Sequence, residues 1–340
     1  MSLNKPIWKL RDWIDINKLD WDGLSLNENA IELLKENKDK INWNILSSNE
    51  NAIELLKENP EKINWIYLSK NPNAIRLLKD NKDKINWSYL SYNENAIELL
   101  QENTEKIDWD LLCYNENGIK ILENNEEKIN WNNLSRNKKA IEILEKNPEK
   151  INWDILCYND NAINIIEKHK EKINWFNLSF NKNAIKLIEE NQDKINWHIL
   201  SLNTNLKAIE LLEENPEKIN WNYLSYNKNA IELLKENPEK INWYNLSKNP
   251  NAIKILENQQ DKINWDNLSY NINSMKILEK NPEKINWKYL SNNPSIIELD
   301  YEQMRINNQD IYEELIKEVM KPSRVFKDPE YDYLEELFGD

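Results

Sequence analysis

The residue types that most often serve as nucleophiles, general bases or soft metal ligands are scarce in this chain, which has two histidines and two cysteines. Acid–base catalysis and metal binding both need partner side chains close by. His169 stands at the end of a predicted helix, where related segments have Asn, and His198 follows Trp197 in a variable position. Neither histidine has such a partner nearby in the sequence. We therefore expect two surface histidines, no catalytic residue, no metal and no cofactor.

The cysteines, Cys113 and Cys157, occupy the same position of two tandem repeats that are separated by one other repeat. Helical repeats stack at about 10 Å each, which places the two residues about 20 Å apart and beyond disulfide reach. Small buried thiols in a reducing compartment are the expected result.

Composition excludes several function classes. The chain has only three glycines and neither a Walker nor a dinucleotide-binding fingerprint, which argues against nucleotide enzymes. Its formal net charge of -14 repels phosphate backbones and anionic membranes. The first thirteen residues lack the apolar run of a signal peptide, and no later segment is apolar enough to span a membrane. We expect a cytoplasmic protein that is not secreted, with no nucleic-acid and no membrane partner.

Tryptophan sets the period of the sequence. Thirteen tryptophans are spaced 22 residues apart, except for one step of 24 that carries two extra residues around Asn205 to Lys207, where we expect a loop. These are Trp21, Trp43, Trp65, Trp87, Trp109, Trp131, Trp153, Trp175, Trp197, Trp221, Trp243, Trp265 and Trp287. With Trp as position 1, the consensus is W-x-x-L-S-x-N-x-N-A-I-x-L-L-x-x-N-P-E-K-I-N.

This consensus predicts two short helices in each repeat. Apolar residues at positions 10, 11, 13 and 14 form one face of a helix that Asn49 or Asn51 caps in the second repeat and that Asn59 and Pro60 end. Asn64 then caps the shorter helix that carries the next tryptophan. A unit this small cannot bury its own apolar residues, so neighbours must stack. The predicted fold is an all-α solenoid of about thirteen repeats with the tryptophans in its core.

Asparagine fills position 7 in all thirteen repeats, from Asn27 to Asn293. An exposed loop would accept almost any polar residue, so a fixed amide indicates a structural contact. We expect a ladder in which each Asn side chain binds loop backbone in its own or the adjoining repeat.

Function on a solenoid usually lies in the positions that vary while the framework stays fixed. Positions 6 and 3 are two such variable columns, and Tyr and Arg are residue types enriched at binding hot spots. The candidate partner-binding residues are Tyr67, Tyr89, Tyr92, Tyr114, Arg136, Tyr158, Phe180, Tyr223, Tyr226 and Tyr270. An alternative is that position 6 packs between neighbouring first helices, although Lys70 and Lys248 in that column favour exposure. A code of one base per repeat would need basic backbone contacts, which the net charge opposes.

Both ends depart from the consensus. We expect residues 1–20 to form an N-terminal capping hairpin, residues 21–299 to form the repeats, and residues 300–340 to form a C-terminal helical cap and tail. An amphipathic helix from Ile311 to Met320, ended by Pro322, should close the last repeat. A second apolar cluster could support self-association as a homodimer, and its residues are Tyr331, Tyr333, Leu334, Leu337 and Phe338.

The repeat I-N-W-x-x-L-S-x-N-x-N-A-I-x-L-L-x-x-N-P-E-K-I resembles that of many paralogous proteins of giant DNA viruses of the Mimivirus and Megavirus type, over residues 18 to 299. The segments Y-E-E-L from Tyr312 and P-S-R-V from Pro322 are similar to that family's ending, with Lys321 where the family has His. The resemblance implies a viral protein of the host cytoplasm with no assigned activity. Together these observations predict a non-enzymatic scaffold that binds a host or viral protein, or alternatively an assembly protein that self-associates through its termini.

Overall fold

The computed structural model describes residues 6–320 and is an all-α repeat solenoid, as the sequence predicts. Its contacts divide the chain into two compact units. One unit is Asp12–Ile296, which holds the repeats. The other combines the segments that precede and follow the repeats in the sequence.

Each repeat begins with a short helix that starts at its tryptophan. The preceding Asn or Asp accepts hydrogen bonds from first-turn backbone N–H groups in all thirteen repeats, which fixes the start. The predicted cap Asn64 is confirmed, because its Oδ1 lies 3.1 Å from the backbone nitrogen of Ile66. The first helices are α1 (Trp21–Leu26), α3 (Trp43–Leu46), α5 (Trp65–Lys70), α7 (Trp87–Tyr92), α9 (Trp109–Leu112), α11 (Trp131–Leu134), α13 (Trp153–Leu156), α15 (Trp175–Leu178), α17 (Trp197–Leu200), α19 (Trp221–Tyr226), α21 (Trp243–Leu246), α23 (Trp265–Tyr270) and α25 (Trp287–Ser291).

Twelve repeats continue into a second helix. Asn49, not Asn51, is the cap in the second repeat, and it acts on a 3-10 turn (Glu50–Ala52) that precedes the helix. Asn59 ends the helix by donating from its side-chain amide to the carbonyl of Leu55 at 2.8 Å. The second helices are α2 (Ile31–Glu36), α4 (Ile53–Lys57), α6 (Ile75–Lys79), α8 (Ile97–Gln101), α10 (Ile119–Glu123), α12 (Ile141–Lys146), α14 (Ile163–Lys168), α16 (Ile185–Glu190), α18 (Leu206–Glu213), α20 (Ile231–Glu236), α22 (Ile253–Asn258) and α24 (Met275–Glu279).

The two-residue insertion lies at the start of helix α18 and is not the loop that we expected. Asn205 caps this helix through the backbone N–H of Lys207, and the helix begins at Leu206. The extra residues therefore lengthen the second helix at its N-terminal end to eight residues.

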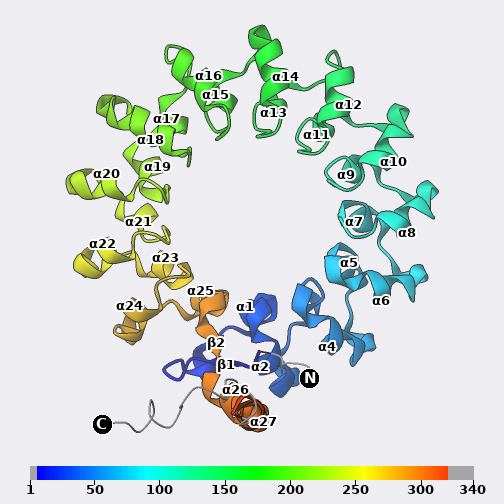
Figure 1. Cartoon of the computed structure of the whole chain (residues 1–340), viewed down its shortest axis with the longest axis vertical. Helices are drawn as coiled ribbons and strands as arrows, with labels where there is room; N and C mark the ends of the chain where they lie inside the picture. Colours follow the sequence, from blue (N-terminus) through cyan, green and yellow to red (C-terminus); the bar gives the residue numbers. More distant parts are fainter. Residues whose placement is uncertain (1–5, 321–340) are drawn as a thin grey trace, which may run out of the picture. The chain divides into compact units, whose positions relative to one another are not determined.

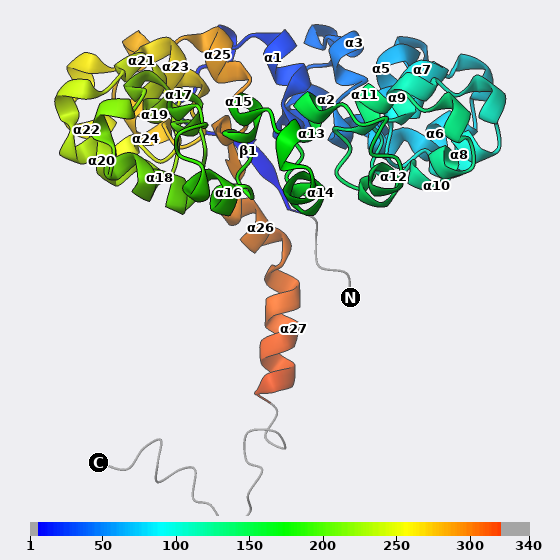
Figure 2. The same cartoon turned by 90° about the horizontal axis from the view of Figure 1, so that it is seen from above.

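Within the repeat unit, first helices lie on the inner side and second helices on the outer side (Figure 1). Seen edge-on, the first helices lie toward one rim and the second helices toward the other (Figure 2). Leucines from both kinds of helix meet between these layers, and Leu46, Leu55, Leu56 and Leu68 are fully buried. The core is therefore a continuous layer shared between neighbouring repeats.

The tryptophans are only half-buried, so the expectation that they lie in the core is wrong in part. The lysine at position 20 covers the exposed ring face in twelve of the thirteen repeats. For example, Lys106 Nζ lies 4.6 Å from the ring centroid of Trp87. A cation over an indole face is favourable at such a boundary, which explains why the lysine recurs with the tryptophan.

The predicted asparagine ladder is confirmed. Asn71 accepts a hydrogen bond from the backbone N–H of Asn73 at 3.0 Å and donates to the carbonyls of Ser47 at 3.3 Å and Asn49 at 2.9 Å in the preceding repeat. The turn bond to position 9 recurs in all thirteen repeats. Each amide thus satisfies buried backbone groups on both sides of a junction between repeats.

A buried serine at position 5 provides a second bond across the junctions. Ser47 Oγ accepts from the backbone N–H of Asn64 at 2.9 Å and donates to the carbonyl of Trp43 at 2.8 Å. Cys113 and Cys157 replace this serine in two repeats, where they are buried and free, as predicted. Burial raises the pKa of each thiol to about 11.

The repeat unit closes on itself, because the first repeat stacks on the thirteenth. Across this closing junction, the backbone N–H of Asp20 donates to Ser291 Oγ at 2.7 Å, and the Asn27 amide donates to the carbonyl of Asn293 at 3.1 Å. Equivalent bonds join consecutive repeats elsewhere. Helices α1 and α25 accordingly pack side by side (Figure 1). The expected terminal caps are thus wrong, since each end of the array covers the other.

The thirteenth repeat is built from both ends of the unit. Helix α25 supplies its first half, and the chain leaves the consensus where other repeats start their second helix. The 3-10 turn Ile16–Lys18 supplies the second half, with Lys18 Nζ 5.1 Å from the ring of Trp287. The N-terminal capping hairpin is therefore wrong for residues 6–20, which contain a strand and this turn.

Glycine at position 3 of the first repeat suits the closing junction. A Cβ on Gly23 would lie 2.9 Å from Ser291 Cβ and 3.0 Å from Asn292 Nδ2. Every other repeat has Asn or a larger apolar residue at this position. The close approach of α1 to α25 thus depends on the missing side chain.

The second unit pairs the segments on either side of the repeats. Strand β1 (Trp8–Leu10) and strand β2 (Ile297–Leu299) are antiparallel, with Lys9 opposite Glu298. Arg11 forms an ion pair with Glu298 at 2.7 Å. Helices α26 (Tyr301–Asn307) and α27 (Gln309–Val319) follow, which confirms the predicted C-terminal helix. Pro322 and the predicted self-association residues, Tyr331, Tyr333, Leu334, Leu337 and Phe338, lie outside the described residues.

Candidate protein-binding surface

The ten residues predicted to bind a partner, here called the aromatic stripe, lie on first helices or directly after them. Nine of the ten are exposed, and Phe180 is half-buried. Helix geometry explains this, because positions 4 and 5 face the core while positions 3 and 6 point away from it. In α5, Leu68 and Ser69 are fully buried while Tyr67 is 47% exposed.

Sequence reasoning missed position 2, which adds apolar residues to the same helices. Ile66, Phe176 and Tyr244 are exposed there, although no single residue type dominates this column. Tyr289, at position 3 of the last repeat, is also exposed. Position 2 could have been found in the same way as the stripe, because its residue type varies between repeats while the framework positions stay fixed.

Between the fifth and eighth repeats, the stripe is tied to its neighbours. Tyr114 donates from its hydroxyl to Asn133 Oδ1 at 2.8 Å, one repeat further on. Tyr158 makes the same bond to Asn177 at 2.7 Å, and its ring lies 5.5 Å from that of Phe180. The alternative that position 6 packs against the next repeat therefore describes this part of the stripe, whose ring faces remain partly open.

Between the tenth and thirteenth repeats, the stripe surrounds a hollow of about 530 Å³, here called the tyrosine groove. Four tyrosines from four consecutive repeats line it, with Lys248 and Asp266 as its charged residues. Lys248 Nζ lies 5.2 Å from the ring of Tyr244. The lining comprises Tyr226, Tyr244, Lys248, Pro250, Asp266, Asn267, Tyr270, Asn271, Ile272 and Tyr289.

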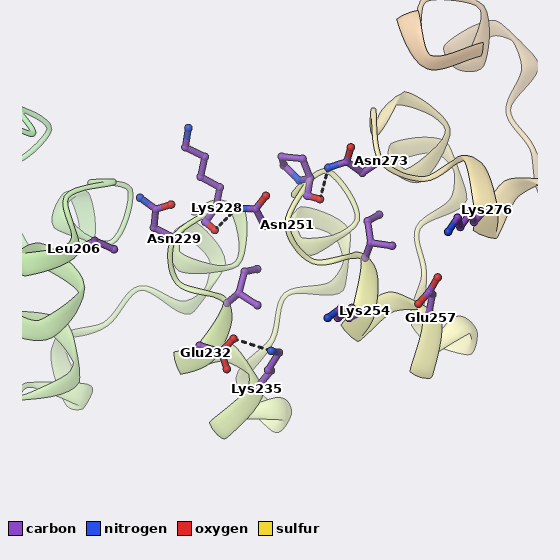
Figure 3. Close-up of a pocket in the computed structure, with 13 residues that line it drawn as sticks. Leu206, Lys228, Asn229, Glu232, Lys235, Asn251, Lys254, Glu257, Asn273 and Lys276 are labelled. Carbon is purple, nitrogen blue, oxygen red and sulfur yellow. Dashed lines mark hydrogen bonds and ion pairs between the residues drawn. The ribbon is translucent and has the colours of Figure 1, made fainter. Parts of the chain in front are cut away.

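A larger and more open hollow, of about 800 Å³, lies along second helices from repeats nine to twelve (Figure 3). Its walls combine polar side chains with the apolar side chains of Leu206, Ile231, Pro250 and Ile253, and their hydrogen bonds belong to the framework. The Asn251 amide donates to the carbonyl of Lys228 at 2.9 Å, and Lys235 pairs with Glu232 at 2.7 Å. Lys254 and Lys276 add positive charge, so four lysines face two glutamates here. This surface carries more charge than the tyrosine groove and has no aromatic side chain in its lining.

The two histidines lie in different repeats. His198 is exposed, as predicted. His169 is partly covered, with its ring 4.9 Å from that of Trp153 and its Nδ1 3.7 Å from Glu171. Within residues 6–320, no three His, Cys, Asp or Glu side chains are grouped closely enough to hold a metal ion. Helices in this part of the chain are also too short and too polar to cross a membrane.

Comparison of the chain with protein-family models, with curated proteins and with solved structures found no match. Functional inference therefore depends on the geometry of the surface itself.

Proposed function

We propose that this protein is a non-enzymatic scaffold that binds a host or viral protein through the aromatic stripe. The observation that carries the proposal is the exposure of nine of the ten stripe residues on a framework that repeats without interruption. Eight of the ten stripe residues are tyrosine, a residue type enriched at the centres of protein interfaces. Their positions are fixed by short helices that are each capped at the start, so ordering the stripe on binding costs little entropy.

The chemistry of the stripe supports a protein partner over other classes. The chain has 59 acidic and 45 basic side chains. Because phosphate backbones are also negatively charged, the electrostatic contribution to nucleic-acid binding is unfavourable. The resemblance to giant-virus repeat proteins supports a partner of the host or of the virus.

Capture experiments with matched variants test the proposal. The triple variant Tyr92→Ser, Tyr226→Ser and Tyr270→Ser removes three exposed rings, and we expect it to lose about tenfold or more of any captured partner. The control replaces Glu58, Glu102 and Glu236 with Ala on the outer helices, where we expect no loss. Equal retention by both variants would show that binding, if any, does not use the stripe.

Self-association through the C-terminal segment is a second candidate. Ile316, Val319 and Met320 on or next to α27 are exposed by 60%, 51% and 64%, which leaves apolar area available for another copy. Light scattering after size-exclusion chromatography of the full chain, and of a chain lacking residues 301–340, tests it. We expect the deletion to convert a dimer to a monomer. A monomeric full chain at about 100 µM would rule this candidate out.

A further inference from the structure

We propose that the tyrosine groove binds an extended, proline-rich segment in the polyproline II conformation. This inference depends on the proposed scaffold function and names the class of partner for one part of the stripe. It is argued from the hydroxyl groups, charge and spacing of the groove.

Tyrosine hydroxyls in the groove have no partner within the described chain. Tyr226 and Tyr270 occupy position 6, as Tyr114 and Tyr158 do, but only the latter two donate to the next repeat. The residue equivalent to Asn133 is Asn245 for Tyr226. Both side-chain amides donate to a carbonyl of the preceding repeat, at 3.0 Å and 2.9 Å, but only Asn133 also accepts from a tyrosine hydroxyl. Exposure follows this difference, at 55% and 59% for Tyr226 and Tyr270 against 38% and 40% for Tyr114 and Tyr158. The groove therefore presents rings together with free donors.

Those donors suit a proline-rich chain. Proline has no backbone N–H, so the carbonyls of such a segment are its main hydrogen-bonding groups and they need donors from the protein. Aromatic rings provide flat apolar surfaces for the pyrrolidine rings, which is the usual arrangement in polyproline II recognition. The segment is already extended before binding, so it loses little entropy.

Other recognition modes fit the groove less well. A phosphorylated segment needs a cluster of arginines, whereas the groove has one lysine and one aspartate. An amphipathic helix needs a broad aliphatic surface, and Ile272 is the one branched aliphatic side chain in the lining. A strand would need an open sheet edge, and the groove is built from helices and turns.

Spacing also favours this ligand. Neighbouring helices pack about 8–10 Å apart, and the four tyrosines come from four consecutive repeats. A polyproline II chain turns once every three residues and rises about 9 Å per turn. Tyr226 and Tyr270 both occupy position 6 and lie two repeats apart, so about two turns of the ligand match their separation, and prolines at every third position would meet both rings.

Fluorescence anisotropy with labelled peptides tests the inference. The probe is a neutral dodecapeptide with proline at every third position, and the comparison peptide has the same composition with the spacing scrambled. We expect the spaced peptide to bind at least about tenfold more tightly. The variant Tyr226→Phe with Tyr270→Phe keeps both rings and removes both hydroxyls, and we expect it to weaken binding about fivefold or more.

The control is Tyr301→Phe, which removes one exposed hydroxyl outside the stripe. We expect this control to bind the spaced peptide as the unmodified protein does. Equal binding of spaced and scrambled peptides, or an equal effect of the groove variant and the control variant, would overturn the inference. If either of these results occurs while the triple serine variant still loses partner capture, the inference about the groove fails and the proposed scaffold function is retained.

Discussion

The junction between the second and third repeats and the closing junction between the thirteenth and first are held by the same contacts. The two junctions differ in how far apart the partners lie in the sequence. In the former, Ser47 and Asn64 belong to consecutive repeats. In the latter, the equivalent pair is Ser291 and Asp20, which are 271 residues apart. Equal geometry at so large a separation shows that the contacts, rather than the local connection, define the junction.

The difference lies in what holds the partners near each other. The entropy cost of closing a loop grows only slowly with the number of residues in the loop. Closing the array therefore costs little more entropy than bringing together distant parts of any domain. Even so, the closing junction is the one junction between repeats that no direct peptide connection spans. We expect it to open first, and the ladder, the glycine, the serine column and the lysines each offer a way to test this.

The largest effect should come from removing a ladder amide. Asn159→Ala deletes three hydrogen bonds and leaves buried backbone groups unsatisfied, so we expect a loss of about 3–5 kcal/mol in urea unfolding followed by circular dichroism. Asn27→Ala at the closing junction deletes two bonds, and we expect about 2–3 kcal/mol. Equal losses, with uniform loss of hydrogen-exchange protection in both variants, would contradict a weaker closing junction.

Gly23→Ala should act on the closing junction alone. The added Cβ meets Ser291 at 2.9 Å, and we expect a cost of about 1–3 kcal/mol from overpacking. Hydrogen exchange should rise at residues 20–29 and 287–295 and stay unchanged at residues 64–73.

Gly118→Ala provides the control for this substitution. Its added Cβ would meet the flexible end of Leu112 at 2.8 Å, in a position where most repeats have alanine. We expect little change in stability. A larger effect at Gly118 than at Gly23 would mean that the closing junction tolerates separation of α1 and α25.

Two junctions have cysteine in place of serine and should be weaker at high pH. The folded thiols have pKa values of about 11, above the ordinary value of 9.0, because burial disfavours the thiolate. The thiols lose their protons at a lower pH in the unfolded state than in the folded state. Their contribution to the free energy of unfolding should therefore be constant below about pH 9 and fall as the pH rises toward 11. Cys113→Ser with Cys157→Ser replaces a weak sulfur acceptor for the backbone N–H groups of Asn130 and Asn174 with a hydroxyl oxygen, and should gain about 1 kcal/mol at pH 7. Thermal unfolding at pH 7 and pH 10 measures both effects, and a gap that does not widen with pH would contradict the assignment.

The smallest effect should come from the lysines that cover the tryptophans. Lys106→Ala and Lys18→Ala each remove one cation from an indole face, and we expect about 0.5–1 kcal/mol from each. Because Lys18 spans the closing junction, its loss should raise hydrogen exchange near Trp287. The same response in both variants would show that the closing contact adds nothing to local protection.

Sequence periodicity predicted the helix pairs, the solenoid class and the asparagine ladder, because an invariant amide in every repeat indicates a contact made in every repeat. Closure was missed although its signal is present. Lys18, Leu19 and Asp20 fit the K-I-N end of the consensus, with Leu for Ile and Asp for Asn, and the last repeat stops halfway. A partial repeat at each end, each supplying a part that the other lacks, therefore predicts that the two ends of the array join. The free hydroxyl of Tyr226 could not be predicted, because Asn133 and Asn245 are the same residue type at the same position.

A closed array also places a limit on how such a gene can change. An open solenoid can gain or lose a unit by duplication or deletion at no cost to the remaining junctions. Here the first repeat stacks on the thirteenth, so a fourteenth unit would force the other junctions to adopt a shallower angle or leave α1 and α25 unable to meet. The closed shape of the array thus fixes the number of repeats. We expect insertions within a repeat, as at Leu206, to be tolerated more readily than insertions of whole repeats.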